Sequence, residues 1–252
     1  MEWFKFIMKN TIKKLLSIIG WKLVKIKGKK TSVYPHPVPT IHHIKSILTC
    51  KGVLHLGAHR GQEAPVYDWF NKKVLWIEAI PEIFDYLNDY LNHFHNQTAF
   101  CVLLGDEYKN KTNFYISNSD SSCSSIFDFS NLVKEGKLWT DRKLKMKKVL
   151  RLEMKTLDMF IKEKNIDISL FDHWVLDLQG AELLVLKGAQ KSICHCNSIF
   201  IEISKDQYYE KGSATWLAIK DFMLQNNFKL VEEPISPHQE VLFVKNISRL
   251  EN

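Results

Sequence analysis

Glycine and proline are scarce in this chain of 252 residues, with 10 and 7 copies, and the sequence holds no internal repeat and no low-complexity tract. These absences exclude collagen-like, disordered and repeat architectures. Hydrophobic residues make up 45% of the chain and aromatic residues 12%. This is enough apolar surface for one large packed domain with a small appendage.

Cysteine is also rare, and its spacing follows no known pattern. The chain has five cysteines, an odd number, and we expect no signal peptide, which together favour reduced thiols in a cytoplasm. The "CHC" at residues 194–196 lacks a second pair of ligands at the spacing of a zinc site. We therefore interpret this motif as structural and name no metal ligand, and the sequence leaves open whether a divalent metal assists the protein.

Acidic residues are almost absent from the first 30 residues, which hold nine lysines and one acid, Glu2. These 30 residues therefore carry a net charge of about +8. The formal net charge of the whole chain is +7, so the remaining residues sum to about −1. A near-neutral body argues against a nucleic-acid partner. Lysine interrupts each apolar run well before the roughly 20 residues of a spanning helix, and the lysines are spread out, unlike those of a signal peptide.

The apolar residues of this basic segment are spaced as on one face of a helix. They are Trp3, Phe4, Ile7, Met8, Ile12, Leu15, Leu16 and Ile19, and Gly20 follows as a stop signal. Such a helix either lies in a membrane interface or packs against its own domain. With the prolines of "PHPVPT", we expect a helix and linker over 1–40 and a second domain over 41–252. The expected location is the cytoplasm, at the inner face of the membrane if the helix binds lipid.

Strand-like and helix-like segments alternate from residue 52 onward. Apolar strands are expected at 52–57, 73–80, 98–106, 173–180 and 198–204, with helices after several of them. Buried strands that alternate with helices indicate an α/β fold with a mostly parallel sheet. The last two strands, 228–233 and 240–246, have only six residues between them, too few for a crossover helix, so we expect an antiparallel hairpin.

The regular alternation lapses between Gly105 and Thr156. A short strand is expected at 113–117, followed by a serine-rich loop with the letters "SSCSSI". An extended strand is then expected over 143–153, where lysine alternates with apolar residues. We interpret residues 107–155 as an insertion in the domain, and Thr156 as the cap of the helix that follows.

Ligands of open α/β sheets bind outside the carboxyl ends of the strands, so the residues after each strand are the candidates for a site. The first strand is followed by Gly57-Ala58-His59-Arg60-Gly61, a turn of small residues on which a ligand can lie, with Glu63 just beyond. The second strand reaches Glu78 and Ala79. Glu78 lies 21 positions after Gly57, where an acid can accept hydrogen bonds from ribose hydroxyls.

Later strand ends carry further polar residues. Asp106 ends the third expected strand, where it could meet an adenine amino group, and Asp177, Gln179, Glu182 and Glu202 follow or end later strands. Together with the turn, these residues describe an adenosine-binding crevice. A dinucleotide site needs a third glycine, which is missing here, and the final hairpin fits enzymes that use S-adenosylmethionine better.

The segments "GAHRGQE", "WIEAIP", "TLD", "LDLQGAELLVLKGA" and "IFIEIS" carry a resemblance to the FkbM-type methyltransferase family, over about residues 50 to 245. The resemblance implies a class I, Rossmann-like methyltransferase that uses S-adenosylmethionine, often on hydroxyls of sugars or secondary metabolites. The chain departs from the family at His55, where many relatives have an acid. Asp177 or a backbone carbonyl is then left to contact the methionine amino group.

Methylation of an alcohol requires that its oxygen be held in line with the methyl group and that a nearby base take its proton. We favour Asp177 and Glu182 as catalytic residues over His59 and Glu202, because they flank a glycine turn that faces the crevice. Gln179 is expected to orient the acceptor.

The expected acceptor is a sugar or glycan. Phe127 and Trp139 either pack on a sugar face or belong to the core. Two other functions stay open on the residues alone: a nicotinamide-dependent oxidoreductase, and a protein that binds an adenosyl ligand without turnover. The sequence leaves the oligomeric state open.

Overall fold

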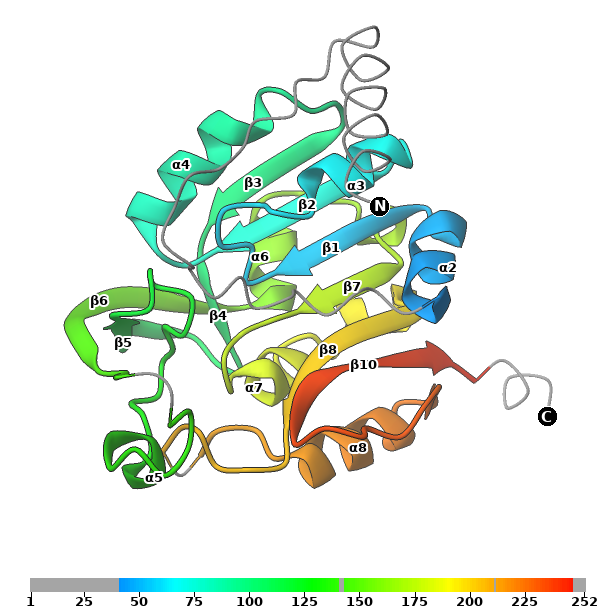
Figure 1. Cartoon of the computed structure of the whole chain (residues 1–252). Coiled ribbons are helices and arrows are strands. Elements are labelled where there is room, and N and C mark those ends of the chain that lie inside the picture. The colour runs from blue at the N-terminus through cyan, green and yellow to red at the C-terminus, as the bar shows by residue number, and fades with distance from the viewer. Residues whose placement is uncertain (1–40, 141–142, 211, 247–252) are drawn as a thin grey trace, which may run out of the picture. The chain divides into compact units, whose positions relative to one another are not determined.

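The computed structural model describes residues 41–140, 143–210 and 212–246, and the expected helix and linker over 1–40 lie outside these ranges. Figure 1 shows the arrangement of the elements. The α-helices are α2 (Ile41–Thr49), α3 (Ala64–Trp69), α4 (Pro81–Leu91), α5 (Asn131–Lys134), α6 (Leu157–Glu163), α7 (Glu182–Lys187) and α8 (Trp216–Gln225), and the 3-10 helices are η1 (Ile168–Leu170) and η2 (Ser192–His195). The strands are β1 (Gly52–Leu56), β2 (Lys73–Glu78), β3 (Gln97–Cys101), β4 (Leu103–Gly105), β5 (Lys109–Ser117), β6 (Met146–Thr156), β7 (His173–Leu176), β8 (Ser198–Ser204), β9 (Phe228–Leu230) and β10 (His238–Lys245).

A seven-stranded sheet forms the centre of the domain, in the order β3-β2-β1-β7-β8-β10-β9. Strand β1 pairs in parallel with β2 on one side and with β7 on the other. Strand β10 runs antiparallel to both β8 and β9, which confirms the expected hairpin. The fold is the class I methyltransferase-like α/β fold that the sequence predicted, with one antiparallel strand near the edge of the sheet.

Helices cover both faces of this sheet. The residues of β1 are all buried, because alternate side chains point to opposite faces and both faces are covered. On one face, Trp76 packs among apolar residues of α2, α3 and α4, and on the other face Trp174 packs among those of α6, α7 and α8. Both tryptophans are fully buried, so the core lies on the two sides of the strands whose carboxyl ends carry the candidate site.

Two of the expected helix starts are confirmed by their first residues. Pro81 lies in the first turn of α4, where its missing N–H has no partner to lose. The Thr156 side chain accepts a 3.1 Å hydrogen bond from the Met159 amide and caps α6.

The third expected strand, 98–106, is in fact two strands. Strand β3 ends at Cys101, and after a bend at Val102, strand β4 pairs in parallel with β6 in a separate three-stranded sheet of order β4-β6-β5. The Val102 amide donates to the Glu78 carbonyl, which holds the bend against the end of β2. Asp106 therefore belongs to the exposed link between β4 and β5 of the second sheet, and not to the carboxyl end of a strand in the main sheet.

The second sheet carries most of the insertion. Strands β5 and β6 form a long antiparallel ribbon, and Figure 1 shows them side by side. The serine-rich loop and α5 lie in the connection between them. Phe129, which this connection contributes, is fully buried beside Tyr209, whereas Trp139 and Phe127 are only partly buried.

All five cysteines are free thiols. No helix within the described ranges is long and apolar enough to cross a membrane.

Candidate active site

The backbone at the end of the neighbouring strand β7 lies close to Gly57. Gly57 has φ +87°, and a Cβ atom there would lie 1.8 Å from the carbonyl oxygen of Asp177. The Asp177 amide also donates a 3.0 Å hydrogen bond to the Leu56 carbonyl. The glycine is therefore needed first for the close approach of the ends of β1 and β7, which corrects the expectation that it only makes room for a ligand. Gly61, at φ +70°, similarly leaves room for Leu87 of α4.

Glu78 lies at the carboxyl end of β2, as expected, and points at the turn after β1. Its Oε2 accepts a 2.8 Å hydrogen bond from the His59 amide and its Oε1 one from the Ile80 amide, also at 2.8 Å. Burial raises the pKa of Glu78 to about 7. Each carboxylate oxygen has two lone pairs, so each keeps one for a further donor. These two free acceptor positions fit the ribose hydroxyls of an adenosyl ligand.

His55 does not face this turn. Its ring stacks on Trp76 with centroids 4.5 Å apart, and its Nδ1 lies 3.2 Å from the Tyr67 hydroxyl. Burial lowers the pKa of His55 to about 3, so the ring is neutral at physiological pH. The imidazole is therefore an uncharged core group, and Asp177 stays the candidate contact for a ligand ammonium group.

An ion pair ties the serine-rich loop to the turn after β1. The Arg60 guanidinium binds both oxygens of the Asp120 carboxylate, and the Asp120 carbonyl lies 3.0 Å from His59 Nε2. The guanidinium also lies over the ring of Tyr86 in α4, 5.6 Å from its centroid. The insertion is thereby held at the edge of the proposed cofactor site, through residues 59 and 60 of the turn.

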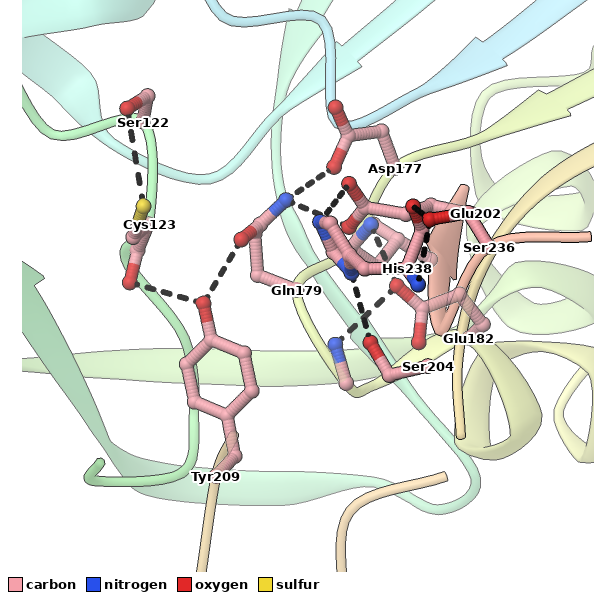
Figure 2. A network of polar contacts seen from close by, with 12 residues as sticks. Ser122, Cys123, Asp177, Gln179, Glu182, Glu202, Ser204, Tyr209, Ser236 and His238 are labelled. Carbon is pink, nitrogen blue, oxygen red and sulfur yellow. Dashed lines mark hydrogen bonds and ion pairs between the residues drawn. The ribbon is translucent and has the colours of Figure 1, made fainter. Parts of the chain in front are cut away.

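Gln179 links two carboxyl groups at the ends of β7 and β8. Its backbone is left-handed, at φ +53°, in the turn after β7. Its Nε2 donates to Asp177 Oδ1 and, at 2.8 Å, to Glu202 Oε2, as Figure 2 shows. Asp177 is exposed, while the Glu202 side chain is only 16% exposed. The structure therefore brings Asp177 and Gln179 together, as expected.

The other end of the Gln179 amide is held by groups that sequence reasoning missed. The Tyr209 hydroxyl donates a 2.7 Å hydrogen bond to Gln179 Oε1, and it also lies 3.2 Å from the Cys123 carbonyl. The Ser125 hydroxyl donates to the Gln179 backbone carbonyl at 2.8 Å. The serine-rich loop thus supports the strained turn that carries Gln179, and Figure 2 shows Tyr209 on the far side of the amide from Asp177.

Glu202 is the more buried partner of Asp177. Its pKa is raised well above its ordinary value, first by burial and then by the negative charge of Asp177. His238 Nε2 lies 3.1 Å from Glu202 Oε1, and His238 Nδ1 lies 2.8 Å from the Ser204 hydroxyl. Burial raises the pKa of Asp177 as well, but Asp177 is the more exposed of the two, so we assign the proton of this pair to Glu202.

Glu182 lines the same small pocket as Glu202 and also binds the backbone at the start of its own helix. Only 2% of it is exposed, and its Oε1 accepts hydrogen bonds from the amides of Leu178 and Gly180 at 2.9 and 3.1 Å. Burial raises the pKa of Glu182 to about 7. These contacts fix the turn that carries Gln179. Glu202, one of the less favoured candidates, is the carboxyl group that the structure pairs with Asp177.

The remaining candidates surround the turn. The backbone carbonyl of Glu63 accepts the Val66 and Tyr67 amides at the start of α3, and Ala58 is buried in the core beside it. Ala79 is half-buried between Glu78 and Ile80. These residues stay candidate cofactor contacts.

Tyr209 and His238 had no sequence signal of their own. Tyr209 lies in the loop after β8 and His238 begins the antiparallel strand β10. Ligands bind at the carboxyl edge of such a sheet, and Tyr209 follows shortly after a strand end. This rule is the only sequence signal that could have pointed to Tyr209. His238 reaches the same edge because β10 runs the opposite way and begins there.

Comparisons with known proteins found a matching family model and several similar solved structures. A family model for the methyltransferase FkbM domain matches residues 55–230, and no curated protein matches the chain. A S-adenosylmethionine-dependent methyltransferase from Aquifex aeolicus is 10% identical, with a TM-score of 0.43, over 79% of this chain and 86% of that one. Magnesium protoporphyrin IX methyltransferase from Synechocystis PCC 6803, solved with bound SAH, is 8% identical, with a TM-score of 0.42, over 94% of both chains. The bifunctional kinase-methyltransferase WbdD is 9% identical, with a TM-score of 0.37, over 77% of this chain and 34% of that one.

Proposed function

Because this chain belongs to the FkbM methyltransferase family, we propose that it transfers a methyl group from S-adenosylmethionine to a hydroxyl of a sugar or surface glycan. The observation that carries the proposal is the pair of carboxyl groups at the ends of β7 and β8, Asp177 and Glu202, bridged by Gln179. The pair adjoins the turn after β1, since the Asp177 backbone touches Gly57.

The bound cofactor would supply an electrophilic methyl carbon on a positively charged sulfur. Asp177 would take the proton of the acceptor hydroxyl as its oxygen bonds to the methyl carbon, and the electrons of the broken carbon–sulfur bond would remain on sulfur. The proton on Glu202 matters here, because it leaves a single negative charge, on the carboxylate that is exposed. Gln179 donates to both carboxyl groups and fixes their orientation.

A small pocket, lined in part by Glu182 and Glu202 and wide enough for a hydroxyl-sized group, adjoins the carboxyl pair. Ser204, Asp206, Tyr208 and Ser213 are among the residues that line it, and they offer hydroxyl and carboxyl groups for hydrogen bonds. Beyond it, the rings of Tyr208 and Trp139 lie 4.4 Å apart and form an apolar edge. Polar groups in a pocket bordered by aromatic rings suit a sugar, which has polar edges and apolar faces.

Incubation with methyl-labelled S-adenosylmethionine and a fractionated cell-surface glycan pool, followed by mass analysis, tests the proposal. We expect a mass increase of one methyl group in one glycan fraction, and its loss in Asp177→Asn. The matched control is Asp221→Asn, which removes an exposed carboxylate from α8. Binding of S-adenosylhomocysteine without transfer to any fraction would indicate a binding protein without turnover, and tighter binding of NADH would indicate an oxidoreductase.

A further inference from the structure

The ribbon β5–β6 presents a strongly basic outer surface. Five exposed cationic side chains, called the basic face below, lie on it and on the segment that leads into β6: Lys111, Lys143, Lys145, Lys147 and Arg151. Exposed and covered residues alternate along β6, as on a strand with one solvent face. Leu150, Leu152 and Met154 pack into the core beneath the ribbon, while Lys147, Val149 and Arg151 point away from it.

Most of the charges of the basic face have no acidic partner. None of the five side chains forms an ion pair within the described ranges, whereas two other lysines of β6 do: Lys148 pairs with Glu82 and Lys155 with Glu163. Two acids lie near the face: Glu153, two residues after Arg151 on the same side of β6, is paired with Lys155, and Asp120, close to Lys147, is bound by Arg60. The basic face therefore carries a net positive charge on a chain whose residues after 30 are close to neutral.

The sign of this charge decides which partners can cover the face. The chain's own residues 1–30 hold nine lysines and one acid, so they are repelled by it. A second copy that brings its own basic face is repelled for the same reason. An anionic partner is attracted, and the attraction acts over about 10 Å at moderate salt.

The residue types distinguish among anionic partners. Four of the five cations are lysines, which act as point charges, whereas specific phosphate recognition favours the planar fork of arginine. One aromatic ring lies among the five, because Tyr115 of β5 pairs with Val149 across the ribbon, but a single half-buried ring offers no row of stacking platforms for successive bases. Val149, 49% exposed, places an apolar group between Lys147 and Arg151. Flat lysine-rich surfaces with interspersed apolar groups suit lipid headgroups.

We propose that the basic face docks the protein on an anionic membrane surface. The strongly basic residues 1–30 are drawn to the same surface and strengthen the attachment. Docking brings Lys147 to the membrane, and with it Asp120 and the serine-rich loop at the edge of the candidate site. The proposal is independent of the identity of the methyl acceptor.

Vesicle sedimentation of the full chain tests this docking, with vesicles of phosphatidylcholine and phosphatidylglycerol at 70:30 and with pure phosphatidylcholine vesicles. The test variant is K143Q/K145Q/K147Q, and the matched control is K162Q/K187Q/K191Q, which removes the same charge from exposed sites on α6, α7 and η2. Each membrane-facing lysine contributes about a fivefold change in partitioning, so the test variant should bind the anionic vesicles about a hundredfold more weakly. The control should lose less than about fivefold, and neither should bind the neutral vesicles.

Equal partitioning of the two variants would overturn the proposal, because the attraction would then come from net charge or from residues 1–30 alone. A single-stranded RNA 20-mer that binds the wild type and loses affinity for K143Q/K145Q/K147Q, while vesicle binding is unchanged, would overturn it in favour of a nucleic-acid surface. Titration with S-adenosylhomocysteine checks that both variants are folded. Vesicle binding does not depend on methyl transfer. The docking proposal and the methyltransferase proposal can therefore be refuted independently of each other.

Discussion

The Tyr209 hydroxyl donates a 2.7 Å hydrogen bond to Gln179 Oε1, and this bond decides which end of the amide faces the carboxyl groups. Burial raises the pKa of Tyr209 well above its ordinary value, so the hydroxyl stays a donor. The amide nitrogen is then directed at Asp177 and Glu202, where a carbonyl oxygen would be repelled. An aromatic residue from the loop after β8 thus orients a side chain from the turn after β7.

Tyr209→Phe should slow methyl transfer about fivefold. The substitution removes the hydrogen bond to Oε1, which is worth about 1 kcal/mol, and frees the amide to turn away from Asp177. The readout is the dependence of kcat on pH, which should change shape as the Asp177–Glu202 pair loses its shared donor. Tyr90→Phe in α4 is the control, because its hydroxyl makes no hydrogen bond within the described ranges. An unchanged kcat and pH profile in Tyr209→Phe would show that Gln179 needs no such support.

Glu78→Gln should weaken S-adenosylhomocysteine binding at least about tenfold, since hydrogen bonds to a charged group are worth about 1.5–3 kcal/mol. The pKa of Glu78 is about 7 in the free protein, and ribose hydroxyls bind best to the ionised form. The affinity of the wild type should therefore rise as the pH is raised through about 7. Isothermal titration at pH 6 and pH 8 measures this, and the variant should lack the rise. The same pH dependence in both proteins would assign it to another group.

Glu182→Gln should change the pH dependence of stability. The pKa of Glu182 is raised from 4.5 to about 7 on folding. Its contribution is therefore fully present below about pH 4.5 and is lost as the pH rises through about 7. Gln keeps the oxygen that accepts the Leu178 and Gly180 amides but carries no charge. Between pH 5 and pH 8 the variant should gain about 3 kcal/mol over the wild type in urea unfolding. The control is Glu135→Gln, at an exposed position. A difference in unfolding free energy between Glu182→Gln and the wild type that stays constant with pH would show that Glu182 is not the titrating group.

Gly57→Ala should destabilise the protein by at least about 3 kcal/mol. The left-handed backbone costs about 1 kcal/mol with a side chain, and the clash with the Asp177 carbonyl adds to it. Gly136→Ala is the matched control, because Gly136 also has a positive φ, +69°, but a Cβ there meets nothing within 4 Å. Its cost should stay near 1 kcal/mol. Similar losses in thermal or urea unfolding would mean that β1 and β7 can move apart at little cost.

The sequence by itself determined the architecture of the domain. Buried strands on a two-sided sheet are continuous apolar runs, so β1, β2, β7 and β8 were visible, and the short link before β10 forced an antiparallel strand. The acid at the end of β2 was also predictable, because the chain direction of a parallel strand decides at which edge its last residue lies.

Only the tertiary structure decided which side chains meet. The bend at Val102 takes the chain from the main sheet to the second sheet, so Asp106 lies away from the edge of the main sheet. The local sequence has the apolar pattern of a single strand. The Glu182 side chain binds the backbone of the turn just before it. Glu202, 25 residues after Asp177, is the carboxyl group that Gln179 links to Asp177. Strand register and loop path set such contacts, and they depend on residues far apart in the chain. The apolar pattern is a local property of the sequence, so it does not predict these long-range contacts.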